Sequence, residues 1–185
     1  MSQRSTEVLR YILVAISAVA ISVAVGALIF HSHSQKAWRA DALAGKVALS
    51  QTQLESLVRE ESLTAYWAGP RPGYLYSIDA TAKDRIFLQY IQANKESKNV
   101  IANSRVIATY YSKDGFARTV AAATRSGNTG FRNPNGSVVF YEKKRKTDVY
   151  LAFPGEEVQI EIFDPLAGQA LSLAILQDQI NKIGA

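Results

Sequence analysis

Apolar residues are concentrated in one uninterrupted segment near the amino terminus and in short periodic segments after it. From Tyr11 to Phe30 the chain has no charged residue, Asn, Gln or Pro. An α-helix rises about 1.5 Å per residue, so a helix over these positions would be roughly 30 Å long, the thickness of the hydrocarbon core of a bilayer. The pattern therefore predicts a single transmembrane helix at residues 11–30.

A cleaved secretory signal is the alternative interpretation of this segment. Such a signal has an apolar core of about 7 to 15 residues and a cleavage site flanked by small residues. The segment is longer, and its end, Leu28-Ile29-Phe30-His31, offers no such site, so we expect an uncleaved signal anchor. Basic residues are equally frequent on its two sides, and the positive-inside rule does not decide the orientation. Because the segment at residues 1–10 is short, we expect it to stay in the cytoplasm and the long part of the chain after residue 30 to lie outside the cell.

After a juxtamembrane stalk at residues 31–50, the pattern predicts one extracytoplasmic α+β domain at residues 51–185. Ser50 and Gln53 form a capping box before a short amphipathic helix, and alternation of period two then predicts strands. The predicted strands cover residues 74–78, 85–91, 105–111, 138–142, 149–153 and 158–162, with helices at 112–124 and 165–180. We expect an antiparallel sheet of about six strands with helices on one face.

The predicted elements form two halves, each with the order strand, strand, strand, helix. An offset of 64 residues places Tyr76 on Phe140, and after the second strand an offset of 52 places Tyr111 on Phe163. The difference equals the length of the polar loop Gln92–Asn103, which would be an insertion in the first half. An internal repeat and a coincidental likeness of two similar units both remain open.

The composition excludes several classes of catalytic, metal-binding and nucleic-acid-binding site. The absence of cysteine excludes disulfides, thiolate catalysis and cysteine-based zinc sites. Both histidines, His31 and His33, lie in the stalk, so the domain has no imidazole for a Ser-His-Asp triad, and we expect neither a metal site nor a cofactor. The net charge of +5 is mild and lacks the dense basic stripe of a nucleic-acid binder.

Two blocks of sequence resemble a family of single-pass membrane proteins from actinobacteria and their relatives. The first is AYWAGPRPGYLYSI at Ala65–Ile78, followed by RIFLQYI, and the second is VYLAFPGEEVQIEIFDP at Val149–Pro165. The resemblance covers roughly Leu54 to Ile180 and the position of the membrane segment, and the loop Gln92–Asn103 departs from it. It implies a location and a fold, but no activity.

An aromatic turn supplies the candidate ligand-binding residues. Two prolines hold the backbone around Arg71, so its guanidinium would be presented beside aromatic faces and could bind a carboxylate, a phosphate or a sugar ring. The alternative is that these aromatic side chains fill the core. The candidates are Tyr66, Trp67, Arg71, Tyr74 and Tyr76.

A second candidate site is a cluster of four cations at a predicted hairpin turn, Lys143, Lys144, Arg145 and Lys146. Outside the cell they could contact anionic lipid headgroups or wall polymers. The alternative is a solvated turn that discourages aggregation of strand edges.

Small residues recur every fourth position within the predicted span, at Ala18, Ser22 and Gly26. Such a spacing lines one helix face and permits close helix approach, so these residues are candidates for association with a membrane-protein partner or with a second copy of the chain.

Carboxylates are the one catalytic option, since Glu156, Glu157 and Glu161 cluster in one strand. Alternation predicts that Glu157 and Glu161 face solvent, where a general acid gains nothing from its surroundings. We therefore expect no catalytic residues and a non-catalytic, membrane-anchored binding or accessory domain of the bacterial cell envelope. The alternatives are a carboxylate-dependent envelope hydrolase and a regulatory partner domain facing the cytoplasm.

Overall fold

The structure is a computed structural model that describes residues 34–93, 104–166, 168–176 and 179–184. The chain divides into two compact units, Met1–Ala40 and Asp41–Ala185. The predicted head, transmembrane helix and first stalk residues, as well as positions 94–103 of the predicted loop, lie outside the described residues. In the part of the chain that is described, no helix has both the length and the apolarity needed to cross a membrane. Residues 34–40 of the first unit are helical.

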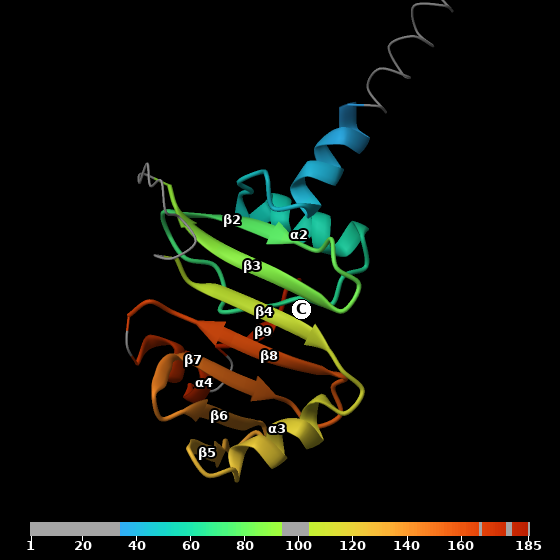
Figure 1. Ribbon diagram of the computed structural model, residues 1–185. Helices are drawn as coiled ribbons and strands as arrows, with labels where there is room; N and C mark the ends of the chain where they lie inside the picture. Colours follow the sequence, from blue (N-terminus) through green and yellow to red (C-terminus); the bar gives the residue numbers. More distant parts are fainter. Residues whose placement is uncertain (1–33, 94–103, 167, 177–178, 185) are drawn as a thin grey trace, which may run out of the picture. The chain divides into compact units, whose positions relative to one another are not determined.

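The second unit is built on a seven-stranded antiparallel sheet, which confirms the predicted α+β class (Figure 1). The strands are β2 (Tyr74–Asp79), β3 (Arg85–Gln92), β4 (Val106–Tyr111), β5 (Asn128–Arg132), β6 (Val138–Glu142), β7 (Arg145–Ala152) and β8 (Val158–Phe163). Their order across the sheet is β2-β3-β4-β8-β7-β6-β5. Two short strands, β1 (Tyr66–Trp67) and β9 (Asn181–Lys182), pair separately. Sequence periodicity located six of the seven strands and missed β5, which contains the helix-facing Gly130.

Three helices accompany the sheet: α2 (Gln51–Glu60), α3 (Gly115–Ala123) and α4 (Gln169–Ile175). The predicted capping box of α2 is present, because Ser50 Oγ accepts from Gln53 N at 3.3 Å and Gln53 Oε1 accepts from Ser50 N at 2.9 Å. This exchange satisfies two backbone donors that a helix start leaves unpaired.

The sheet has two unlike faces, and the expectation that the helices cover one of them is wrong. The buried residues of α4 join the main core with Ile160 and Ile162 of β8, whereas α3 packs on the opposite face, over β5 to β8. There Gln159 Nε2 donates to Thr119 Oγ1 at 2.8 Å. α3 approaches so closely that a Cβ on Gly130 would lie 2.4 Å from the Cβ of Ala123.

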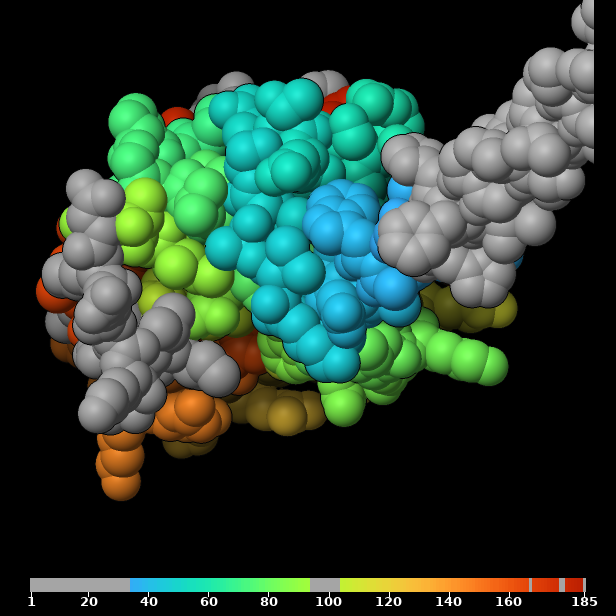
Figure 2. Space-filling model, turned by 90° about the horizontal axis from the view of Figure 1, so that it is seen from above, coloured from blue at the N-terminus to red at the C-terminus, as the bar shows by residue number. Residues whose placement is uncertain are grey.

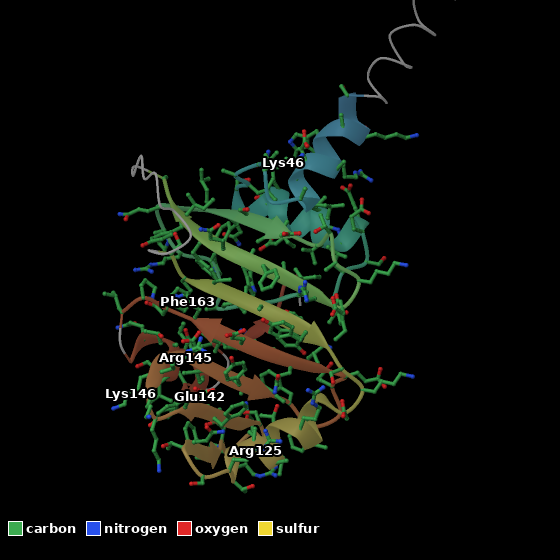
Figure 3. The ribbon with its side chains drawn as sticks, viewed as in Figure 1. Lys46, Arg125, Glu142, Arg145, Lys146 and Phe163 are labelled. Carbon is green, nitrogen blue, oxygen red and sulfur yellow. The ribbon has the colours of Figure 1, made fainter. Side chains whose placement is uncertain are left out.

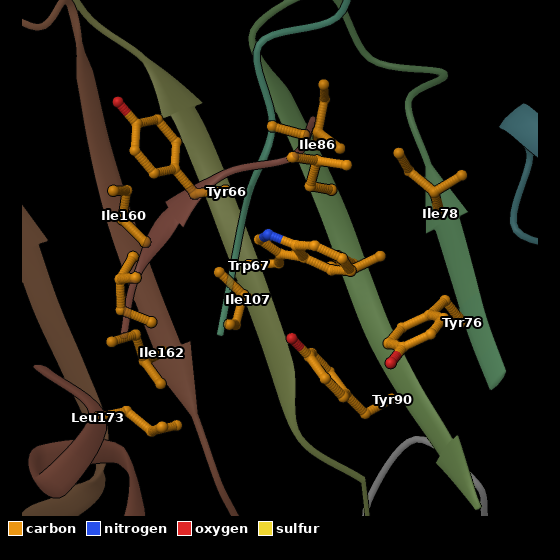
Figure 4. Packing of buried hydrophobic residues seen from close by; sticks show 14 of the residues in the cluster. Tyr66, Trp67, Tyr76, Ile78, Ile86, Tyr90, Ile107, Ile160, Ile162 and Leu173 are labelled. Atoms are coloured by element: carbon orange, nitrogen blue, oxygen red, sulfur yellow. The ribbon is translucent and has the colours of Figure 1, made fainter. Parts of the chain in front are cut away.

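The main core lies on the α4 side of the sheet and contains aromatic contacts (Figure 4). Tyr76 packs edge-on against Trp67 and Tyr90, with ring centroids 6.0 and 5.2 Å apart. The hydroxyl of Tyr90 accepts from Ala68 N at 2.8 Å and donates to Gly69 O at 3.0 Å. The core tyrosines therefore hold the backbone of the aromatic turn in place.

The outer edge of β2 is covered by the chain itself. Residues 44–49 run beside it, with Leu49 N donating to Tyr76 O at 2.7 Å and Tyr76 N to Leu49 O at 2.9 Å. Seen from above that edge, the atoms of residues 44–60 lie over the strand (Figure 2). This cover occupies backbone groups that would otherwise pair with another chain.

Strand registers in the two halves can be compared directly. Arg85 pairs with Tyr110 in β3–β4, and the counterparts under offsets of 64 and 52, Val149 and Ile162, pair in β7–β8. The pairing of the inner strands thus follows the predicted offsets, but the faces do not, since Ile86 and Ile107 belong to the core and their counterparts Tyr150 and Gln159 lie on the opposite face.

The offset of 64 fails in the outer hairpins. Tyr76 pairs with Tyr90, but Phe140 pairs with Tyr150, four residues before the position that this offset requires. The physical reason is the connection: β6 and β7 are joined by a tight turn with a register shift between Phe140 and Glu142, whereas a longer link joins β2 to β3.

Candidate functional site

One face of the sheet carries half-buried aromatic and polar side chains that α3 does not cover. α3 contacts β5, β6, β7 and β8, while β3 and β4 continue the same face beyond it (Figure 1). We call this surface the open face. Its half-buried residues are Phe87, Gln89, Ile91, Val106, Tyr110, Tyr150, Glu161 and Phe163.

Glu161 lies at the centre of the open face and accepts two tyrosine hydroxyls. Tyr110 Oη donates to Glu161 Oε2 at 2.7 Å, and Tyr150 Oη donates to Glu161 Oε1 at 3.0 Å. The registers of β8 with its two neighbours explain this contact, because Glu161 pairs with Tyr150 of β7 on one side and with Ala108 of β4 on the other. Ala108 is small and therefore leaves room for Tyr110 to reach across.

Burial and the carboxylate both act on these tyrosines. Burial is the larger cause that raises the pKa of Tyr110 and of Tyr150, and the negative charge and hydrogen bond of Glu161 raise both further. Both hydroxyls therefore stay protonated at neutral pH and remain donors to Glu161. The arrangement is a fixed carboxylate between two aromatic rings.

Further aromatic contacts hold these rings. Tyr150 stacks on Phe140 with centroids 4.8 Å apart, and Phe87 meets Tyr110 edge-on at 6.2 Å. Phe140 is buried, whereas Phe87 stays half exposed. Phe163 lies at the end of β8 on the same face (Figure 3). These contacts and the hydrogen bonds to Glu161 fix the positions of the two tyrosine rings.

The charges around Glu161 are paired with each other and not with it. Within the described residues, the Glu161 carboxylate forms no ion pair, whereas Arg85 lies 3.8 Å from Asp84 and Arg145 lies 3.2 Å from Asp148. These pairs leave the carboxylate of Glu161 without a compensating cation among the residues described.

Gln89 presents an unsatisfied hydrogen-bond donor on this face. Its Nε2 is buried and has no hydrogen-bond partner among the residues that the structure describes. A buried donor without an acceptor costs free energy, so such groups in native proteins call for an explanation.

A cleft of about 220 Å³ opens beside Tyr110, at the start of α3. It is lined by Asp84, Tyr110, Tyr111, Ser112, Gly115, Arg118 and Gln159. Its charges are of both signs, and Arg118 lies 4.0 Å from Asp114. The cleft extends the open face but presents no dominant charge of its own.

The predicted aromatic turn divides between core and surface. Tyr66, Trp67 and Tyr76 are 3%, 6% and 1% exposed, which matches the alternative that they fill the core. Arg71 is exposed and lies over the ring of Tyr74, with its Cζ 4.3 Å from the centroid. The five candidates therefore do not form one solvent-facing site, and ligand binding by Arg71 and Tyr74 stays a prediction.

The predicted basic cluster lies at the turn between β6 and β7. All four cations, Lys143, Lys144, Arg145 and Lys146, are exposed, and Figure 3 labels Arg145 and Lys146, the first two residues of β7. Arg145 is engaged by Asp148, so three lysines remain as the candidates for an anionic surface. The predicted helix-association residues Ala18, Ser22 and Gly26 lie outside the described residues.

The carboxylate cluster of β8 also divides. Glu156 pairs with Lys182 at 2.8 Å and Glu157 is exposed, but Glu161 is half buried under tyrosines and not freely solvated. The alternation placed Glu161 on the correct face. It did not reveal that Tyr110 and Tyr150 share that face, which required the pairing of β4 with β8 and of β8 with β7.

Comparison of the chain with family models, curated proteins and solved structures finds no match. In the described ranges no group of three or more His, Cys, Asp or Glu side chains is arranged to hold a metal ion. The geometry of the open face therefore carries the functional argument.

Proposed function

We propose that this protein is a non-catalytic binding or accessory domain, anchored in the bacterial cytoplasmic membrane by residues 11–30 and belonging to the actinobacterial family that its sequence resembles. The apolar segment supports the anchor. The soluble domain lies outside the cell in this proposal, and its partner is a membrane protein or a second copy of the chain.

The open face is the observation that carries the proposal. Half-buried aromatic side chains such as Phe87, Tyr110 and Tyr150 are the kind that supply binding energy at protein interfaces. The hydrogen bonds to Glu161 hold two of them in place, so little side-chain freedom is lost when a partner docks. A broad sheet face suits a protein partner better than a small molecule, which prefers an enclosed cavity.

Photo-crosslinking in intact cells tests the open face. A photoreactive phenylalanine at Phe87 or Phe163 should crosslink the full-length chain to one and the same partner, because both positions lie on that face. The same group at Arg125, an exposed residue beyond the end of α3, is the control and should give no such product. Equal products from all three positions, or none from Phe87 and Phe163, would contradict the proposal.

Cysteine accessibility tests the orientation. The chain has no cysteine, so Lys144→Cys introduces a unique thiol at an exposed position. We expect a membrane-impermeant maleimide to label it in intact cells and to label Ser5→Cys in the predicted head only after permeabilisation. The reverse pattern would place the domain in the cytoplasm and support the regulatory alternative.

A further inference from the structure

We propose that Glu161 binds a lysine or arginine side chain of a partner polypeptide that docks on the open face. The inference rests on the proposed binding function and names the chemistry that this face recognises. Glu161 has two hydroxyl donors but no cation, and two aromatic rings flank it. An ammonium or guanidinium group would satisfy the carboxylate and also contact the ring faces.

The charges that face this position from each neighbouring element favour a cation. Arg85 on β3 is offset by Asp84, Arg145 on β7 by Asp148, and Arg118 on α3 by Asp114. The described basic residues near the centre of the face are thus paired with other carboxylates, and in the described structure no ion pair is formed by Glu161. A cationic side chain complements it, whereas an anionic one would be repelled.

Gln89 points to a polypeptide as the carrier of that cation. Its unpartnered Nε2 needs an acceptor, and a partner's backbone carbonyl supplies one when the amide turns outward. A peptide segment therefore offers both groups that the open face lacks, a cationic side chain and a carbonyl oxygen. A small amine offers only the first.

The test measures binding of a defined peptide to the full-length chain in neutral detergent micelles. The probe is acetyl-Val-Lys-Val-amide, and its matched control carries an Nε-acetylated lysine, which removes the charge and keeps the length. Fluorotyrosine incorporated into the chain reports on Tyr110 and Tyr150 by fluorine NMR, with resonances assigned through single Tyr→Phe variants. The charged peptide should shift both resonances saturably and bind about tenfold more tightly than the neutral one.

Substitutions at Glu161 in β8 and at Glu157 just before β8 locate the site. Glu161→Gln removes the charge, keeps a carbonyl acceptor for one of the two tyrosines, and should weaken binding of the charged peptide about tenfold. Glu157→Gln removes the same charge from an exposed position just before β8 and should change binding by less than about twofold. Equal affinity for the two peptides, an unaffected Glu161→Gln variant, or no saturable binding of the charged peptide would each overturn the proposal. The comparison of peptides on the unmodified chain decides the question even if a variant misfolds.

Failure of this inference is distinguishable from failure of the proposed function. Crosslinks from Phe87 and Phe163 that persist in the Glu161→Gln variant would keep the open face as the binding surface and discard the cation. Their absence in the unmodified chain would discard the surface itself.

Discussion

The two faces of the sheet use tyrosine in different ways. On the core face, Tyr90 directs its hydroxyl to the backbone of residues 68 and 69 and is 1% exposed. On the open face, Tyr110 and Tyr150 direct theirs to the carboxylate of Glu161 and remain half exposed. The first arrangement fixes a turn, and the second positions a charge. A hydrogen-bonded aromatic residue is therefore part of the core on one face and stays half exposed on the other.

The largest difference between the faces should appear on removal of an aromatic ring. Trp67→Ala opens a cavity in the core and should cost about 4 kcal/mol of unfolding free energy. Phe87→Ala removes a half-exposed ring and should cost about 1 kcal/mol, because water already reaches that side chain. Urea unfolding followed by circular dichroism measures both. Similar losses would mean that the open face is as tightly packed as the core.

A buried ion pair should likewise contribute more to the free energy of unfolding than an exposed one. Arg105 and Asp164 join β4 to the end of β8 by two contacts, at 2.9 and 2.8 Å, and their side chains are 11% and 5% exposed. Asp164→Ala leaves the guanidinium unpaired and should cost about 3 kcal/mol. Asp41→Ala breaks an exposed pair with Lys46 and should cost less than about 1 kcal/mol.

Urea unfolding of the two variants gives the loss of unfolding free energy in each, and the ratio of the two losses tests this prediction. If Asp164→Ala were as mild as Asp41→Ala, the buried pair would contribute no more than a surface contact.

The packing of α3 against the sheet should depend on Gly130. A Cβ there would lie 2.5 Å from the carbonyl oxygen of Ala123, so Gly130→Ala must push the helix away and should cost about 1 to 3 kcal/mol. Hydrogen exchange should quicken in α3 and β5 but not in β3. Unchanged protection in α3 would show that the helix accommodates the methyl group without moving.

The sequence predicts the helices and strands better than it predicts the contacts between them. Period-two alternation located β4, β7 and β8 and placed Glu161 on the correct face, since alternation is a local property. Register is not local, so the contact of Glu161 with Tyr110 and Tyr150 could not be derived from spacing. The position of α3 was missed for a related reason. The periodicity of α3 shows its apolar side but not which sheet face it packs on, and the close approach at Gly130 comes from β5, a strand that the sequence analysis did not locate.

The smallest predicted effect is a loss of stability at alkaline pH. It is also the effect that distinguishes the two faces most specifically. The pKa values of Tyr90, Tyr110 and Tyr150 are raised above the ordinary value of 10.0 chiefly by burial, but Glu161 adds to the shift only for the latter two. A tyrosine whose pKa is raised by folding contributes stability that is complete below about pH 10 and is lost as the pH rises toward its folded pKa. Unfolding free energy should therefore fall above pH 10.

Glu161→Gln separates the two faces in this alkaline range. With the negative charge gone, the pKa of Tyr110 and of Tyr150 should move down toward the ordinary value, whereas Tyr90 depends on burial and should not change. Phenolate absorbance during an alkaline titration measures this, with Tyr110→Phe and Tyr90→Phe used to identify each tyrosine. Glu157→Gln is the matched control and should leave the titration unaltered, because no tyrosine hydroxyl donates to that carboxylate in the described structure. If the pKa of Tyr110 is the same in Glu161→Gln as in the unmodified chain, the carboxylate is not held between the rings. The open face would then have no central charge.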